Sequence, residues 1–476
     1  MPDLARVKTF SQLSRSTTAT ENLPRFSNVA SSFTSNILIV GGSYSGLAAL
    51  RSLQTKLSQR FIQLQAKEKQ NSAPITITLV EPKNGLLNII GIPKSVVDPK
   101  FAKTQYIPFC QLKHVKFTTI ISNDDKSIYN EGRVDDNGES ESWYDDKKND
   151  TFEGVNVRFV QGKVTHLDQY RAQYVLNNVA DSGSHEGTIE FDYVILASGR
   201  DRAWPVTPRA NTMSEYMEDM ERICNMIRDA NNSSVIGAGA VGIELAADIK
   251  TKFPEKTVNL IHPYEHFPSE PQLSTEFKQM VQDSIERSGV NVYLNTRINT
   301  SLSASESSQS STFLSSYKGD LVTQDTKKVI HSDLNLWCTS KTNNISFLSS
   351  DLASKYVTNG DIDVNDYLQL SSSSSPTIPN FFVLGDLVNL PIIKSAGWAM
   401  YMGRQTANNI TSMIFENGQL VEPMADLKNV PKGMVLVGGN DEIISELAGE
   451  VQLNHEWYKK EYLDYCIGKI RATLDV

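Results

Sequence analysis

Two glycine-rich turns constrain the fold of this chain more than any other feature. "GGSYSG" at residues 41–46 follows the apolar run "NILIV", and "GAGAVG" at 237–242 follows "SSVI". A helical pattern of apolar residues comes after each turn, and then a β-branched strand pattern, "ITITLVE" (75–81) or "TVNLIH" (257–262). Strand, glycine turn, helix and strand in this order are typical of dinucleotide-binding units. The sequence therefore predicts an α/β fold with two Rossmann-like domains.

The composition of the two turns suits the binding of a pyrophosphate. A pyrophosphate needs backbone N–H donors and the positive end of a helix, and only small residues let the backbone come close to it. The second turn has all three glycines, whereas Ser43 replaces the middle glycine of the first, a substitution by another small residue. Neither turn contains the GxxxxGK[ST] motif of nucleoside triphosphatases. The predicted phosphate-binding residues are Gly41, Gly42, Ser43, Gly46, Gly237, Gly239 and Gly242.

An acidic residue at the end of the next strand commonly binds the ribose of the nucleotide. In the first unit Glu81 has this position, and we expect it to bind a ribose hydroxyl. In the second unit the strand ends on His262 instead. Since no carboxylate stands there to bind a 2′-hydroxyl or to repel a 2′-phosphate, the sequence does not separate NADH from NADPH.

Two turns indicate two different dinucleotides. A flavin on the first turn and a nicotinamide on the second would allow a hydride to pass between their rings. Two alternatives stay open: a duplicated domain with one degenerate site, and glycines that serve only the packing of helix on strand.

Composition excludes several other classes of function. The net charge is −9, and no Lys/Arg-rich run offers a surface for nucleic acid. No run approaches the roughly 18 apolar residues of a transmembrane helix. The four cysteines lie far apart, which gives neither a CxxC pair nor a disulfide framework and suits a reducing compartment. The scattered histidines predict no metal site.

Several segments lie outside the two units. Residues 1–35 are predicted to be a disordered tail or a mitochondrial presequence. The stretches 123–151, 301–316 and 371–375 are polar or serine-rich and are predicted to be mobile surface loops. Near the C-terminus, a helical pattern places four apolar residues on one face. We expect this face to pack on the flavin domain or to contact a membrane or a quinone: Leu463, Ile467, Ile470 and Leu474.

The motifs resemble those of flavoproteins with two dinucleotide-binding domains. The run "ELAADIKTKFPEKTVNLIHP" (244–263) is similar to the second nucleotide unit of apoptosis-inducing-factor-like, mitochondrion-associated (ferroptosis-suppressor-type) NAD(P)H:quinone oxidoreductases, a family with fungal members. "NFFVLGDLVNLPIIKSAGWAMYMGRQTANNI" (380–410) resembles the flavin-closing segment of that family. The resemblance implies the pyridine nucleotide-disulphide oxidoreductase fold, with FAD as cofactor and NADH or NADPH as co-substrate.

The resemblance also implies roles for further residues. Ala197 and Gly199, in "ASG", match a turn at the end of the first part of the flavin domain. Gly385 and Asp386 would bind the ribityl or phosphate side of FAD, and Lys394 would lie near the isoalloxazine. Glu244 would orient the nicotinamide. The alternatives are that Glu244 complements the helix dipole in a first turn, and that Lys394 is an exposed lysine at a helix start.

The expected organisation follows from these motifs. The predicted FAD domain is discontinuous (36–209 and 331–412), and an NAD(P)H domain (210–330) is inserted in it. A C-terminal segment (413–476) completes the chain. The resemblance implies hydride transfer from NAD(P)H to FAD and then to a quinone, in the cytoplasm or a mitochondrion, with peripheral membrane contact as an option.

The chain departs from the family at several positions, among them Ser43 in the first turn. Ser340 replaces a glycine of a second turn, and Leu387 stands beside Asp386. Because of these departures, a regulatory protein that binds the nucleotides without turnover is the alternative function.

Overall fold

The computed structural model describes most of the chain. The described residues are 35–68, 74–112, 115–124, 128, 152–177, 186–299, 318–339, 342–430 and 432–474. The predicted tail up to residue 34, the stretch 301–316 and most of 123–151 lie outside these ranges.

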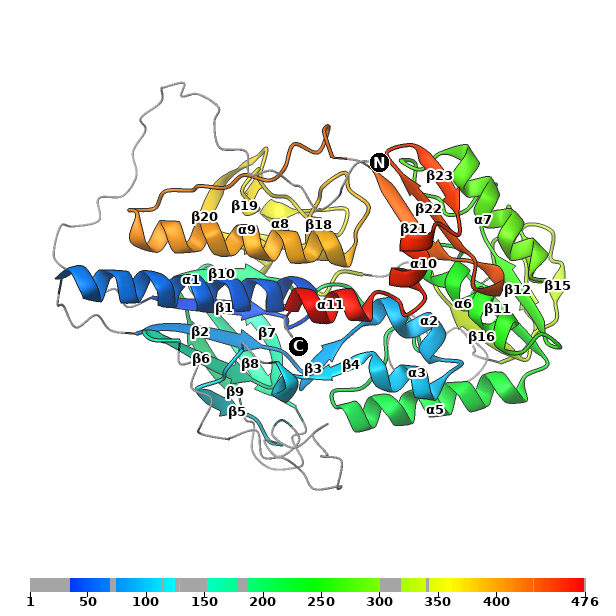
Figure 1. The fold of residues 1–476 in the computed structure, drawn as a ribbon, viewed down its shortest axis with the longest axis horizontal. Helices are drawn as coiled ribbons and strands as arrows, with labels where there is room; N and C mark the ends of the chain where they lie inside the picture. The colour runs from blue at the N-terminus through cyan, green and yellow to red at the C-terminus, as the bar shows by residue number, and fades with distance from the viewer. Residues whose placement is uncertain are drawn as a thin grey trace. The chain divides into compact units, whose positions relative to one another are not determined.

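Seven of the described strands form the first sheet, in the order β19-β20-β10-β1-β2-β6-β5 (Figure 1). All neighbours are parallel except β19, which runs antiparallel to β20. Parallel strands covered on both faces are apolar throughout, as the sequence of β1 shows. The bounds are β19 Gln369–Ser372, β20 Ser375–Val383, β10 Tyr193–Leu196, β1 Asn36–Val40, β2 Ile75–Val80, β6 Val155–Val160 and β5 Thr119–Ile121.

Two long helices, α1 (Tyr44–Glu68) and α9 (Ala396–Phe415), lie side by side against this sheet (Figure 1). They come very close at Gly403, where an added Cβ would lie 2.4 Å from the carbonyl oxygen of Ser45. Segments more than 300 residues apart in the chain thus pack directly on each other, which brings the start of α9 near the first glycine turn.

The second sheet is fully parallel, in the order β13-β12-β11-β16. Its strands are β13 Asn291–Tyr293, β12 Thr257–Ile261, β11 Asn232–Ile236 and β16 Leu334–Trp337. Three helices pack in the same domain: α5 Met213–Asp229, α6 Ala240–Lys252 and α7 Thr275–Arg287.

The strand β16 corrects the predicted boundary at residues 330 and 331. It was expected in the FAD domain, but it pairs with β11 from Ser233 to Ile236. The second domain therefore extends through Trp337, because the apolar run "LNLW" completes the parallel sheet beside the strand of the glycine turn.

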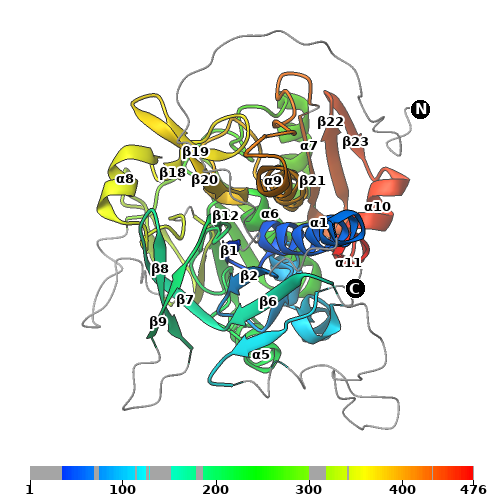
Figure 2. The same cartoon turned by 90° about the vertical axis from the view of Figure 1, so that its left-hand side faces the viewer.

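Shorter elements lie between the strands of these sheets along the chain. The strands β7 Gly162–Leu167, β8 Arg171–Leu176 and β9 Glu186–Glu190 run together as an antiparallel sheet (Figure 2). The remaining elements are β3 Gly85–Leu87, α2 Ile92–Ser95, α3 Pro99–Thr104, β4 Tyr106–Pro108, β14 Leu321–Val322, β15 Val329–Ile330, α8 Ser350–Tyr356, β17 Val357–Thr358 and β18 Asp361–Ile362.

The five serines at 371–375 are not the mobile loop that their composition predicted. They form the tip of the hairpin between β19 and β20, where Ser372 pairs with Ser375. The hydroxyls of Ser371 and Thr377 lie 2.8 Å apart across the hairpin. Pairing with the long strand β20 supplies the ordering that serine side chains cannot supply alone.

The C-terminal segment begins with an antiparallel sheet of β21 Gly433–Val437, β22 Ile443–Leu447 and β23 Glu450–Leu453. Two helices follow, α10 Glu456–Tyr462 and α11 Ile467–Leu474. The single helical face expected here is interrupted. Tyr465 and Cys466 have φ values of 55° and 60°, which are left-handed and end the right-handed helix between α10 and α11.

The two parts of this interrupted face pack differently. Ile467, Ile470 and Leu474 join the core of α1 and α9, as expected, whereas Leu463 packs in a separate cluster. None of the helices described is long and apolar enough to cross a membrane.

Candidate dinucleotide-binding site

The first glycine turn leads from the carboxyl end of β1 into α1. Gly41 has a φ of +104°, and its N–H donates to the carbonyl of Val80 at 2.9 Å. An added Cβ would lie 2.4 Å from the Ala197 carbonyl oxygen at Gly41, and 1.9 Å from the Gly41 carbonyl oxygen at Gly46. Only glycine fits at these two positions, so the turn is held close to β2 and β10.

The carboxylate of Glu81 is fixed against this turn. Its Oε2 accepts the N–H of Gly42 at 2.7 Å, and its Oε1 accepts the N–H of Lys83 at 3.0 Å. The side chain is buried. Since a carboxylate has about four acceptor positions, Glu81 can still accept hydroxyl donors. Ser43, next in the turn, accepts the N–H of Leu47 through its carbonyl at 2.8 Å, which closes the start of α1.

The second turn combines tight packing with open space. Gly237 has a φ of +106°, and an added Cβ would lie 3.0 Å from the carbonyl carbon of Cys338. At Gly242 an added Cβ would lie 1.8 Å from the Gly237 carbonyl oxygen. Gly239 differs, because no heavy atom of the described residues lies within 4 Å of the position that an added Cβ would take. It is the N-cap of α6 without a side-chain cap, so this helix start has room for an anion.

Asp386 lies in the short helix η3 (Gly385–Leu387), directly after β20. Its Oδ2 is 3.1 Å from the Nε of Arg200, and its carbonyl accepts a second guanidinium N–H at 3.1 Å. Arg200 follows the turn that ends at Gly199, where again no described atom lies within 4 Å of an added Cβ. Because β10 and β20 are neighbours, their carboxyl ends bring the ASG turn and Asp386 together.

Lys394 is half-buried, so its interpretation as an exposed lysine is wrong. Its ammonium group donates to the carbonyls of Val388 and Asp386. Burial lowers the pKa of Lys394, an effect that Asp361 opposes and Arg200 reinforces.

Arg202 adds a further cation to this region. Burial lowers the pKa of Arg202, and its charge interacts with those of Asp386 and Arg200. Arg200, Arg202 and Lys394 thus gather three cations near Asp386, and this positive charge favours the binding of an anionic group.

Glu244 lies on α6 and faces the C-terminal segment. The helix begins at Ala240 with no acid in its first turn, so the helix-dipole interpretation is wrong. The Oε1 of Glu244 accepts the N–H of Val437 in β21 at 3.3 Å. Burial raises the pKa of Glu244 well above its ordinary value, and Asp248 raises it further. Burial thus favours the protonated form of this carboxyl group, which can donate a hydrogen bond.

His262 is held against the second glycine turn. It is buried, and its Nδ1 accepts the N–H of Ala238 at 3.2 Å. Burial lowers the pKa of His262, and the charge of Arg297 lowers it further. The imidazole is therefore neutral at neutral pH, and it orients the backbone between Gly237 and Gly239.

A buried polar chain connects the two units through the C-terminal segment. The hydroxyl of Tyr44, just behind the first turn, donates to Asn88 Oδ1 at 2.5 Å. The amide of Asn88 donates to the carbonyl of Tyr465 at 3.0 Å, and the Tyr465 hydroxyl donates to Asp248 Oδ2 at 2.5 Å. Asp248 lies on α6, behind the second turn, so the C-terminal segment is part of the scaffold of the site.

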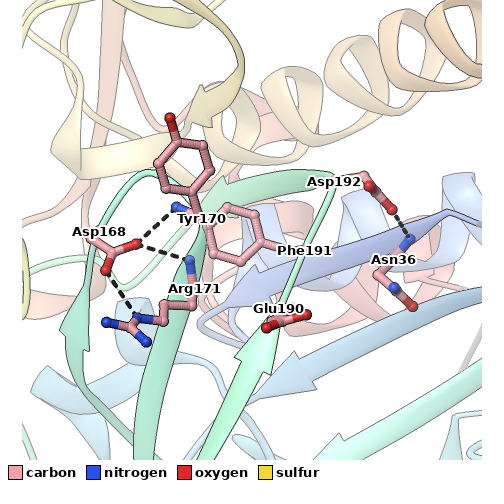
Figure 3. A pocket seen from close by; sticks show the side chains of 7 residues that line it. All are labelled: Asn36, Asp168, Tyr170, Arg171, Glu190, Phe191 and Asp192. Carbon is pink, nitrogen blue, oxygen red and sulfur yellow. Dashed lines mark hydrogen bonds and ion pairs between the residues drawn. The ribbon is translucent and has the colours of Figure 1, made fainter.

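A separate hollow lies at the opposite ends of the strands of the first sheet, away from the glycine turn (Figure 3). Its lining includes Asn36, the first residue of β1, and Asp192, directly before β10; the Asn36 N–H donates to the Asp192 carboxylate at 2.8 Å. Asp168 accepts the N–H groups of Tyr170 and Arg171. This hollow lies at the amino ends of the strands, whereas nucleotides bind at the carboxyl ends.

Sequence reasoning missed the residues that come from distant parts of the chain. Arg200 directly follows the ASG turn, and a cation next to a turn expected to bind the cofactor was a usable signal. Val437, Asn88 and Tyr465 lie in stretches without a motif, so no local pattern indicated that they contact the two units.

Together, two sheets of mostly parallel strands, each with a glycine turn at the carboxyl end of one strand, define a flavoprotein with two dinucleotide-binding domains. The pyridine nucleotide-disulphide oxidoreductase family matches residues 35–403, and the chain belongs to it. Its cofactors are accordingly FAD and a nicotinamide dinucleotide. The open backbone at Gly199 and Gly239, the carboxylate of Glu81 and the cations around Asp386 fit these groups.

Several known proteins are similar to the chain over most of its length. Oxidoreductase OXR1 of Ajellomyces capsulatus is 25% identical over 425 residues, which cover 86% of this chain and 80% of that protein. Ferroptosis suppressor protein 1 of Xenopus tropicalis is 22% identical over 415 residues, covering 87% and 88%. Apoptosis-inducing factor homolog B of Dictyostelium discoideum is 23% identical, covering 79% and 81%. The predicted resemblance is thus confirmed.

Solved structures share the fold. NDH2 of Plasmodium falciparum in complex with NADH has a TM-score of 0.61 at 12% identity, covering 93% of this chain and 96% of that one. A NAD-dependent persulfide reductase of A. fulgidus has a TM-score of 0.53 at 20% identity. The match covers 86% of this chain but 63% of the reductase, so the chain spans just under two thirds of that neighbour.

Proposed function

We propose that this oxidoreductase transfers a hydride from NADH or NADPH, bound on the second turn, to FAD, bound on the first, and passes the electrons on to a quinone. The observation that carries the proposal is the pair of glycine turns, which one buried polar chain from Tyr44 to Asp248 connects. Two dinucleotides held by connected units can bring their rings together.

Different residues of the chain would bind FAD, stabilise its reduced form and orient the nicotinamide. Glu81 would accept ribose hydroxyls of FAD, and Arg200 would orient Asp386 toward the ribityl side. FAD, when bound, supplies the redox chemistry of hydride and electron transfer. Lys394 and Arg200 would provide positive charge where negative charge increases on reduction. Glu244, in its protonated form, would donate a hydrogen bond to the nicotinamide carboxamide and set the face of the ring.

An apolar hollow at the start of α9 supports a quinone as the acceptor. It is lined by Ser395, Gly397, Trp398, Tyr401 and Ala425, directly after Lys394 in the chain. The rings of Trp398 and Tyr401 meet edge to face with centroids 5.6 Å apart. A flat aromatic acceptor could stack on such rings.

The compartment is part of the proposal. All four cysteines are free and buried, which suits the reducing conditions of the cytoplasm or the mitochondrial matrix. If the quinone comes from a membrane, the protein would contact that membrane peripherally.

One experiment tests the function. Purified protein is expected to show flavin absorbance that disappears when NADH or NADPH is added without oxygen, and returns when a water-soluble quinone follows. Flavin that stays oxidised with both nucleotides would identify the alternative, a regulatory protein that binds nucleotides without turnover.

Two variants test the acceptor separately. Trp398→Ala is expected to slow reoxidation by the quinone and to leave flavin reduction unchanged. Trp457→Ala, which removes an exposed ring on α10, is the matched control. Equal reoxidation rates in both variants would contradict the acceptor site at the start of α9.

A further inference from the structure

The loops that follow β12 and β13 form a fixed wall beside the second glycine turn. The N–H of His262 donates to the carbonyl of Tyr293 at 2.8 Å, and the N–H of Thr296 donates to the carbonyl of His262 at 2.9 Å. A third bond runs from the N–H of Asn295 to the carbonyl of Tyr264 at 3.1 Å. These backbone bonds hold the residue that follows, Arg297, next to the loop of Tyr264.

An arginine and a tyrosine face each other on this wall. The guanidinium of Arg297 lies 5.4 Å from the centroid of the Tyr264 ring, within the range of a cation–π contact. The Tyr264 ring in turn meets His262 edge to face, with centroids 5.4 Å apart. Among the described residues, no carboxylate forms an ion pair with Arg297. Glu265 is the one acid in the loop 262–267; it is exposed and does not pair with Arg297 either. The guanidinium is thus positioned by a ring and keeps its hydrogen-bond donors.

The position of this pair relative to the turn determines what it can bind. In a dinucleotide-binding unit the adenosine ribose lies at the end of the second strand, where a carboxylate selects the 2′-hydroxyl and an arginine accommodates a 2′-phosphate. Here the second strand, β12, ends at Ile261, and the next residue is neutral His262. A 2′-phosphate would meet no carboxylate at that position, and Arg297 lies close enough for its charge to act on His262.

We infer that Arg297, held over Tyr264, forms a subsite for the 2′-phosphate of NADPH, and that the chain binds NADPH in preference to NADH. The inference rests on the proposed function only for the use of the nucleotide as hydride donor. Arginine suits the role because its planar group can form two parallel hydrogen bonds with a phosphate. The cation–π contact with Tyr264 limits its freedom before the nucleotide arrives, which reduces the entropy lost on binding.

Binding of nucleotide fragments tests the subsite without any redox reaction. The probes are 2′,5′-ADP, which carries the 2′-phosphate, and 5′-ADP, which lacks it, titrated by calorimetry into the FAD-loaded protein. Wild-type protein is expected to bind 2′,5′-ADP more tightly. Arg297→Ala should weaken 2′,5′-ADP by about ten- to a hundredfold, the loss of hydrogen bonds to a charged group, and change 5′-ADP by less than about twofold.

Arg228→Ala is the matched control, since it removes the same charge from the end of α5, at the amino edge of the second sheet. Arg297→Lys, which keeps the charge but not the planar group, should retain part of the preference. Equal binding of the two probes to the wild type, or equal losses in Arg297→Ala and Arg228→Ala, would overturn the subsite. Tight 2′,5′-ADP binding through Arg297 with no bleaching of the flavin would instead leave the subsite intact and refute the proposed function.

Discussion

Replacement of Asp248 by asparagine should change how the stability of the protein depends on pH. Asp248 is 5% exposed, and its Oδ2 accepts the hydroxyl of Tyr465 at 2.5 Å. Burial raises its pKa from the ordinary 3.8 to about 7, while Tyr465 and Lys94 lower it and Asp441 raises it. Glu244, one turn earlier on α6, is the other buried carboxyl beside it.

The sign of the effect follows from proton linkage. The pKa in the folded state lies above that of the unfolded chain, so the stability contributed by protonated Asp248 is fully present below about pH 4 and is lost as the pH rises through about 7. A difference of this size in pKa corresponds to about 4 kcal/mol. Asparagine has a similar shape, still accepts the Tyr465 hydroxyl and carries no charge. Relative to the wild type, Asp248→Asn should therefore gain up to about 4 kcal/mol between about pH 4 and about pH 8.

The assay is guanidinium unfolding of the FAD-loaded proteins, followed by tryptophan fluorescence at both pH values. Titrating groups that do not interact with Asp248 cancel, because the measured quantity is the difference between variant and wild type at each pH. Glu244 does not cancel fully, since Asp248 raises its pKa in the wild type. Asp283→Asn, at an exposed position on α7, controls for the loss of one negative charge. A stability difference between Asp248→Asn and wild type that is the same at both pH values would refute the reasoning.

Three further predictions concern the nucleotide sites. Gly242→Ala should lower the denaturation midpoint strongly, since its Cβ would lie 1.8 Å from a backbone oxygen. Gly239→Ala should fold normally but raise the Kd for the nicotinamide nucleotide, because its Cβ would enter the open space that the nucleotide is proposed to occupy. Equal denaturation midpoints of the two variants would contradict this. Glu244→Ala should slow flavin reduction about tenfold in stopped-flow absorbance while FAD stays bound, and Glu244→Gln, which keeps a donor, should retain most of the rate; equal rates in the two variants would argue against the hydrogen bond. Arg200→Ala should raise the Kd for FAD about tenfold or more in reconstitution of apoprotein followed by flavin fluorescence, because it removes the 3.1 Å pair with Asp386; unchanged affinity would exclude that role.

The two glycine turns show how much of the fold could be predicted from local sequence. Gly41 and Gly237 both have φ values above +100°, and Gly46 and Gly242 both lie against the carbonyl oxygen of the glycine that opens their turn. These are steric requirements within six residues, so the sequence displays them directly. The apolar strands before and after each turn are local patterns too, which is why both sheets and the family could be recognised.

The contacts that complete the site are of another kind. Arg200 and Asp386 are 186 residues apart, Glu244 and Val437 are 193 apart, and Asp248 and Tyr465 are 217 apart. Nothing in the neighbourhood of any one of these residues indicates its partner.

The sequence by itself determined two dinucleotide-binding units and their glycine turns. Only the tertiary structure decided that β16 completes the second sheet, that the serines 371–375 form a hairpin, and that the C-terminal segment connects the two units. Backbone sterics of a turn act between near neighbours, and sequence therefore records them position by position. Parallel strand pairing and buried polar contacts join segments that are distant in the chain, so they exist only once the chain has folded.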